Sequence, residues 1–220
     1  MHYTNLYDKF CELLPDHQGV FYPAAEFDVF DEQDKAWRIR FGIATFVRKK
    51  YAVIASGSDF VHDTYWPGEL RDPPVPARAH ALRLWRPETE RSLVIAHMHG
   101  LWDPAGKEDT SARDEQFAKF EALVNGMTNP GSLPVVVCGD FNILPDSKYL
   151  AHFKRMGFRE LVEDGNYMGT RTSFYKRKKD SRLPYFADYM LVNSRVKVKK
   201  FDVVYEPEVS DHCPLVLDIE

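Results

Sequence analysis

The sequence predicts an α/β sandwich built from mixed or antiparallel sheets, because strand-like segments outnumber helical ones and several follow one another directly. These apolar segments span 78–85, 92–99, 133–138, 185–192, 197–205 and 213–219. Helical periodicity is confined to a few separate segments. With 220 residues, 44% of them hydrophobic, the chain can form one sizeable core, so we expect a single domain over 1–220.

The N-terminal quarter predicts one helix followed by a hairpin. Apolar side chains recur at helical spacing between Tyr3 and Pro15, with Thr4 or Asn5 as the N-cap. Strands at 37–46 and 51–55 flank a basic turn, Arg48-Lys49-Lys50, which favours a hairpin. The proline-rich segment 67–76 predicts a surface loop.

Two further helices are expected around the apolar strand 133–138. Ser111 can cap the first, whose apolar stripe predicts packing against a sheet. Asp146 can cap the second, which ends at Gly157. The stripe of the first helix comprises Phe117, Phe120, Leu123, Val124 and Met127.

Charge and cysteine content exclude some functional classes. Twenty-nine basic and 33 acidic residues leave a formal charge of −4, so no broad cationic surface is available to hold nucleic acid by counterion release alone. The three cysteines are odd in number and widely spaced, as expected of small buried side chains in a reducing compartment. No apolar segment has the length of a membrane span and no secretory signal is evident, which predicts a cytoplasmic protein.

A first polar cluster follows the apolar segment Leu133 to Cys138, which should be buried on both faces. Gly139 frees the backbone to turn, and Asp140 and Asn142 emerge at the strand end. The aspartate can accept a proton from an attacking water or hold a metal, and the amide can hydrogen-bond that water or a phosphate oxygen. A plain Asx turn explains the same residues equally well.

A second cluster, Asp211 and His212, precedes the last apolar segment. Neighbouring side chains on extended backbone point to opposite faces, so Asp211 is poorly placed to orient the ring of His212. Asp188 is the better candidate, because it is a single charge within an otherwise apolar strand and needs a partner there. The alternative is a structural salt bridge between Asp188 and an arginine.

Other polar residues carry weaker signals. His97 and His99 share one strand face at a spacing that zinc also uses, although no third ligand is near in sequence; we place His99 at the strand end and His97 one layer deeper. Arg171 is a candidate phosphate contact, because a guanidinium matches phosphate oxygens. Arg113 and Gln116 lie on the first turns of a helix, where exposed polar residues are usually inert.

Taken in order, these residues resemble the endonuclease/exonuclease/phosphatase superfamily, which includes pancreatic deoxyribonuclease, the apurinic endonucleases and neutral sphingomyelinases. The resemblance covers about half of the chain. It rests on five stretches: His99-Gly100-Leu101-Trp102, Asp109-Thr110 with Arg113 and Gln116, Gly139-Asp140-Phe141-Asn142, Ala187-Asp188-Tyr189 and Ser210-Asp211-His212.

The resemblance implies a four-layer sandwich, two sheets between helices, and a metal-dependent phosphoesterase that uses Mg²⁺ or Mn²⁺. It implies that Asp140 and Asn142 align the water, that Asp188 orients His212 and that His99 contacts phosphate. It also makes Asp211 a metal ligand, and Arg113 joins Arg171 as a candidate substrate contact. The implied partner is a phosphate-ester substrate, whether nucleic acid, lipid or small molecule; nothing indicates an obligate protein partner.

The likeness departs from the family at the N-terminus. Members ordinarily open with a strand bearing an asparagine, a helix, and a strand ending in Gln-Glu, whose glutamate is the chief metal ligand. Glu26 lacks that strand context. We therefore expect the first strand-helix-strand unit to be missing, a sheet edge to be exposed and metal binding to be weakened. The alternative function is a non-catalytic binding module that keeps the fold without the metal.

Overall fold

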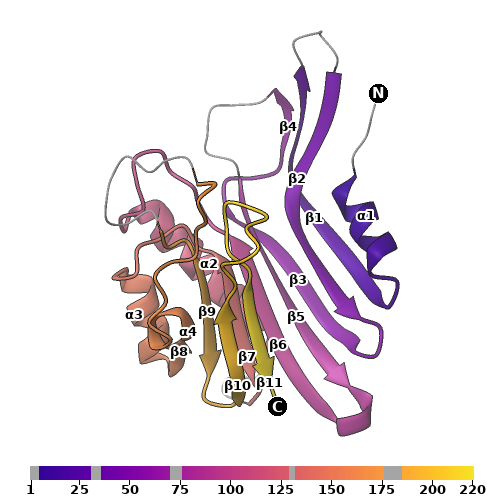
Figure 1. The fold of residues 1–220 in the computed structure, drawn as a ribbon, viewed down its shortest axis with the longest axis vertical. Coiled ribbons are helices and arrows are strands. Elements are labelled where there is room, and N and C mark those ends of the chain that lie inside the picture. Colours follow the sequence, from indigo (N-terminus) through magenta and orange to yellow (C-terminus); the bar gives the residue numbers. More distant parts are fainter. Residues whose placement is uncertain (1–4, 31–35, 70–75, 129–131, 176–184) are drawn as a thin grey trace.

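The computed structural model describes residues 5–30, 36–69, 76–128, 132–175 and 185–220. Its central element is a six-stranded mixed sheet with the order β3-β5-β6-β7-β9-β8 (Figure 1). Only the β6–β7 pair is parallel among these neighbours. The strands are β3 (Ala52–His62), β5 (Ala77–Arg86), β6 (Arg91–His99), β7 (Val135–Asp140), β8 (Phe158–Glu160) and β9 (Asp188–Asn193).

Helices α2 (Ser111–Met127) and α3 (Lys148–Arg155) pack on one face of this sheet. Their N-caps are Thr110 and Ser147, each one residue from the position predicted by sequence. The core between helices and sheet combines small strand residues with aromatic rings from the helices, as the apolar stripe predicted. The same part of the chain also contains two short helices, η1 (Pro87–Thr89) and α4 (Leu161–Asp164).

Two separate pieces pack on the opposite face of the six-stranded sheet. One is a three-stranded sheet of order β2-β1-β4, with β1 (His17–Phe30), β2 (Ala36–Arg48) and β4 (Trp66–Glu69). The other is a hairpin of β10 (Val198–Val203) and β11 (Leu215–Ile219). Figure 1 shows the hairpin in front of β7 and β9, with β1 and β2 to its right.

Helix α1 (Leu6–Leu13) lies on the outer side of the three-stranded sheet, where the Tyr7 ring packs against Phe21 and Phe46. Its N-cap is Asn5, one of the two predicted. The molecule therefore has helices outside two sheet layers, which confirms the predicted α/β sandwich. No helix among the described residues is both long and apolar enough to cross a membrane.

Two predictions for the N-terminal part were wrong. The strands flanking Arg48-Lys49-Lys50 do not form a hairpin: β2 pairs with β1, and β3 pairs with β5 in the other sheet. The turn is real, but it carries the chain from one layer to the next. Part of the predicted loop 67–76 belongs to β4, which pairs in parallel with β1; residues 70–75 lie outside the described residues.

A buried chain of hydrogen bonds joins the two sheets near their middle. Thr45 Oγ1 of β2 lies 2.8 Å from His80 Nδ1 and 2.7 Å from His97 Nε2. Ser56 Oγ lies 2.9 Å from the other nitrogen of His80. Burial lowers the pKa of both histidines to about 4, helped by the charge of Arg78 beside His80. Both rings are therefore neutral at physiological pH.

This network predicts a loss of stability in acid. His80 has a pKa of about 4 in the folded protein and 6.5 in the unfolded chain. Between these two pH values the unfolded chain binds more protons than the folded protein does. The free energy of unfolding therefore falls as pH drops from about 6.5 to about 4. One such histidine contributes up to about 3 kcal/mol to that fall. Urea unfolding of wild type and His80→Gln across this window measures the difference. The same pH slope in both proteins would contradict the prediction.

Candidate active site

Three of the predicted residues occupy one row across three adjacent strands. His99 ends β6, Asp140 ends β7 and Asp188 begins β9. The sheet register pairs His99 with Asp140, and Asp140 with Asp188. Side chains paired directly across strands share a face and lie close together. Sheet pairing alone thus brings together residues that are far apart in the sequence.

The ring of His212 closes over this row from the loop before β11. Its Nδ1 lies 3.0 and 2.8 Å from the two oxygens of Asp188, so the ring donates its Nδ1 proton to that carboxylate. Its Nε2 lies 3.7 Å from Asp140 Oδ2. The structure therefore places Asp188 next to His212, as expected from the sequence, and shows no salt bridge from Asp188 to an arginine among the described residues.

Arg171 reaches the same cluster from the facing segment. Its side chain is 4% exposed, and Nη1 donates to Asp211 Oδ2 at 3.1 Å and to Nε2 of His212. Nη2 lies 3.9 Å from Asp140 Oδ2, and the guanidinium stacks on the ring of Tyr175. A buried guanidinium among carboxylates provides a fixed positive charge for an anionic group.

Asn142 lies directly behind Asp140 in a left-handed backbone conformation, with φ 51°. Its backbone N–H donates to Asp140 Oδ1 at 3.0 Å, which is the predicted Asx turn. The side chain is also buried, and Nδ2 donates to the carbonyl of Gly100 at 3.3 Å. Oδ1 has no hydrogen-bond partner among the described residues. The turn and a functional role are therefore compatible.

His99 and His97 occupy different depths, as predicted. The His99 ring packs edge-on against Phe41, and its Nδ1 has no partner among the described residues. His97 belongs to the inter-sheet network. Zinc binding by this pair gains no support, because the one cluster of three or more metal-ligating groups found in the described residues contains neither ring.

The electrostatics of the cluster favour a bound cation. Burial, followed by the negative charge of Asp188, raises the pKa of Asp140. Burial lowers the pKa of His99. For His212 burial acts in the same direction, but the hydrogen bond and charge of Asp188 outweigh it, so its pKa is raised. The shifts of Asp140 and His212 thus favour added positive charge between the two carboxylates, whereas burial disfavours it on the His99 ring.

The residues fit a divalent metal. The ligand atoms of Asp140, Asp188 and His212 lie within 4.8 Å of one another, and Oδ1 of Asn142 adds a buried oxygen without a partner among the described residues. Such hard oxygen donors suit Mg²⁺ or Mn²⁺. Asp211, predicted as the metal ligand, is not in this cluster; its half-exposed carboxylate pairs with Arg171.

Arg113, predicted as a substrate contact, is buried in the structure and bonded to backbone carbonyls. Arg113 is 1% exposed, and its guanidinium donates to the carbonyls of Glu108 and Gly106, both at 2.8 Å. Gln116 is also buried and accepts from the backbone N–H of Leu101 at 2.6 Å. Both side chains hold the loop that follows His99 rather than facing a ligand.

Sequence reasoning missed Lys107, which this loop brings to the site. Its Nζ donates to the carbonyl of Phe186, two residues before Asp188. Burial, then the charge of Arg171, lowers its pKa to about 8, against the pull of Asp140 and Asp188. A lysine in the polar segment Gly106-Lys107-Glu108 gives no sequence signal for this position.

A family-level comparison decides the relationship: the Endonuclease/Exonuclease/phosphatase family matches residues 11–212. The chain belongs to this family. Endonuclease/Exonuclease/phosphatase proteins take their name from hydrolysis of phosphoester bonds. No curated protein matches the chain.

Solved structures show the same Endonuclease/Exonuclease/phosphatase fold. A mannosyl-6-phosphatase from Bacteroides thetaiotaomicron is 18% identical with a TM-score of 0.69, covering 97% of this chain and 80% of its own. The human Nocturnin catalytic domain with bound sulfate is 20% identical and has a TM-score of 0.64; the alignment covers 96% of this chain and 77% of the Nocturnin chain. D. rerio TDP2 with a single-strand DNA product is 11% identical and has a TM-score of 0.60; the alignment covers 99% of this chain and 83% of the TDP2 chain.

Proposed function

We propose that the chain is a hydrolase of phosphoester bonds that uses Mg²⁺ or Mn²⁺ and an attacking water. The observation that carries the proposal is the row His99, Asp140 and Asp188 at adjacent strand ends, closed by His212 and Arg171. These groups meet in one place, and they offer a base, a proton donor and fixed positive charge. Water attack at phosphorus needs all three.

Asp140 and Asn142 are proposed to align the water. The raised pKa of Asp140 makes it a better proton acceptor than an exposed aspartate. The partnerless Oδ1 of Asn142 can accept a hydrogen bond from the same water, because its Nδ2 is already held by the Gly100 carbonyl. The water would thus be held by two oxygens whose positions are set by one turn.

His212 and Arg171 are proposed to bind the phosphate oxygens. Asp188 fixes the ring through Nδ1 and so directs Nε2 toward Asp140 and Arg171. In the structure Nε2 accepts from Arg171, so the ring is neutral there; its raised pKa lets Nε2 take up a proton once Arg171 turns to the phosphate, and the protonated ring can then donate to a phosphate oxygen or to the leaving group. His99 and Lys107 would add donors around the same oxygens.

A bound Mg²⁺ or Mn²⁺ would polarise a phosphoryl oxygen. Asp140 and Asp188 are the carboxylates that would hold it, while Oδ1 of Asn142 stays with the water, and Asp211 is a further candidate on the other side of Arg171. The substrate class stays broad. Nucleic acid, lipid and small phosphate esters all suit such a site, because loops around a shared fold set the choice.

The proposal is tested with bis(p-nitrophenyl) phosphate and p-nitrophenyl phosphate in the presence of Mn²⁺. We expect p-nitrophenol release that chelation by EDTA stops and that Asp140→Asn lowers by about 1000-fold. Asp146→Asn, an exposed aspartate a few residues further along the same loop, is the matched control and should keep full activity. Equal turnover by wild type and Asp140→Asn would remove the mechanism.

A non-catalytic binding module is the second candidate. It is favoured by the position of Arg171, whose guanidinium already lies between Asp140 and Asp211 and supplies positive charge without a metal. This candidate predicts that inorganic phosphate binds while neither ester is cleaved. Calorimetric titration with Mn²⁺, run beside the activity assay, separates the two: saturable binding accompanied by turnover rules out the module.

A further inference from the structure

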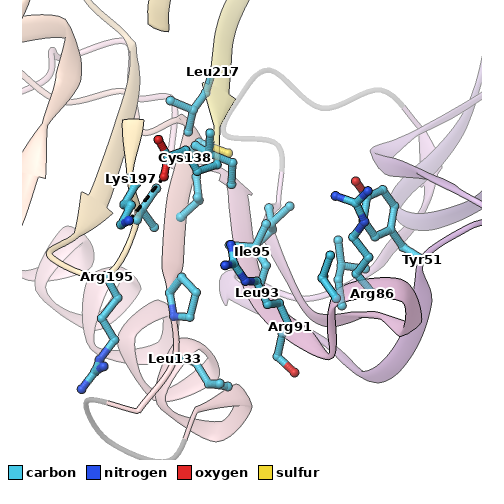
Figure 2. A pocket seen from close by; sticks show the side chains of 18 of the residues that line it. Tyr51, Arg86, Arg91, Leu93, Ile95, Leu133, Cys138, Arg195, Lys197 and Leu217 are labelled. Atoms are coloured by element: carbon cyan, nitrogen blue, oxygen red, sulfur yellow. Dashed lines mark hydrogen bonds and ion pairs between the residues drawn. The ribbon is translucent and has the colours of Figure 1, made fainter. Parts of the chain in front are cut away.

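An apolar groove lies on the face of the six-stranded sheet that is turned away from α2. It has a volume of about 800 Å³ and runs between the three-stranded sheet and the β10–β11 hairpin. Its lining includes Leu93 and Ile95 of β6, Cys138 of β7 and Leu217 of β11 (Figure 2). The two pieces of the second layer thus leave sheet surface between them uncovered by any described residue.

A strand edge borders the groove on each side: β11 contributes lining residues directly, and β2 stands beside the other side, where its Val47 packs with Leu84, Tyr51 and Ile95 of the lining. β2 lies over β5 and β6, since Thr45 contacts His80 and His97, whereas β1 lies further out over β3 and β5, where Tyr22 contacts Ser56 and His80. Among the described strands β2 pairs only with β1, and β11 only with β10. β11, not β10, contributes the lining side chains. Each of these edges therefore offers a row of backbone N–H and C=O groups without a strand partner.

These edges specify the kind of occupant. An extended polypeptide can pair with the unpaired backbone groups and turn alternate apolar side chains onto the groove floor. A helix or a lipid would cover the floor and leave the edges unpaired.

The basic residues of the groove lie at one of its ends, so they fix which end of an acidic segment would bind there. Basic side chains line the end of the groove where β5 ends and β6 begins (Figure 2); Lys197 lies beside Glu220 and Arg86 beside Glu88, so positive charge is in excess there. The basic residues are Arg86, Arg91, Arg195 and Lys197. The floor strands β6 and β7 end at His99 and Asp140, so the opposite end of the groove leads toward the candidate active site.

We propose that this groove docks an extended segment of a partner polypeptide, apolar at alternate positions and acidic at the end that meets Arg86 and Arg91. The segment adds a strand between β2 and β11 and joins the two pieces of the second layer. Its non-acidic end lies toward His99 and Asp140. The inference concerns a protein-binding surface and does not depend on the proposed hydrolysis.

The test uses a fluorescein-labelled probe peptide, Asp-Glu-Val-Thr-Val-Thr-Val-Thr, and the 220-residue chain. Fluorescence anisotropy should show saturable binding, weakened about tenfold or more in Leu217→Asp because a charge then faces the apolar floor. Val216→Asp is the matched control, since Val216 is the preceding residue of β11 and is 51% exposed, and it should bind as wild type does. A peptide with Lys-Lys in place of Asp-Glu should bind more weakly.

Hydrogen exchange on the wild-type chain tests the same proposal without a substitution, so the result does not depend on whether Leu217→Asp folds. Peptide binding should slow amide exchange in β2 and β11 and leave α2 unchanged. Absence of saturable binding, or binding with unchanged exchange in β2 and β11, overturns the proposal. A dimer in light scattering that excludes the peptide also overturns it, because a second copy then occupies the groove. Equal binding of the acidic and basic peptides overturns the assigned direction.

Discussion

Replacing His212 by alanine is expected to lower kcat/KM for a phosphodiester by about 1000-fold, because the change removes the group that we propose to place positive charge at the phosphate oxygens. The His212 ring contacts both Asp188 and Arg171, and its pKa is raised by the carboxylates around it. Steady-state kinetics with Mn²⁺ measure the loss. His152→Ala is the control, since that ring pairs with Glu121 on the helical side and should leave the rate unchanged.

A double-mutant cycle separates positioning by Asp188 from a direct role. Asp188 contacts His212 through both carboxylate oxygens, so Asp188→Asn alone should lower kcat/KM by about 100-fold or more. In the His212→Ala background the same change should cost clearly less than it does alone, because the ring that Asp188 positions is gone and only its part in holding the metal remains. Fully additive losses would show that Asp188 acts independently of the ring, for example as a metal ligand.

The parts of the site that could be predicted are those in which a polar group interrupts an apolar strand. Asp140 and Asp188 stand out because carboxylates at such positions need partners, and strand ends are where chains converge. The Asp188–His212 contact followed from that requirement and from the alternation of side chains on extended backbone. These inferences use local chemistry and hold whichever strands pair.

The errors arose where pairing or burial is decided by distant residues. The chain reversal at Arg48-Lys49-Lys50 looks like a hairpin turn, but β2 pairs with β1, whose Gly19 and Pro23 interrupt the strand pattern in the sequence. Arg113 could have been placed better. It lies four residues before Phe117 and shares its face with Gln116, Phe120 and Val124, and all five are buried. Lys107 had no such periodic signal.

Gly139→Ala is expected to lower the free energy of unfolding by about 4 kcal/mol, combining backbone strain with displacement of a neighbouring strand. Gly139 has φ 129°, a conformation that L side chains rarely adopt. A Cβ there would also meet the backbone oxygen of Met98, its partner in the parallel β6–β7 pair. Because His99 and Asp140 are the next residues on these strands, activity should fall as well.

Gly126→Ala gives the contrasting control on the same chain. Gly126 lies in α2 with open space where a Cβ would stand, so alanine should raise the free energy of unfolding by about 0.5–1 kcal/mol through its higher helix propensity. Urea unfolding of the two variants beside wild type measures both changes in the free energy of unfolding, the decrease in Gly139→Ala and the increase in Gly126→Ala. A loss below about 1 kcal/mol in Gly139→Ala would mean that β6 and β7 can separate at this point without strain. The close parallel pairing would then not be what holds His99 beside Asp140.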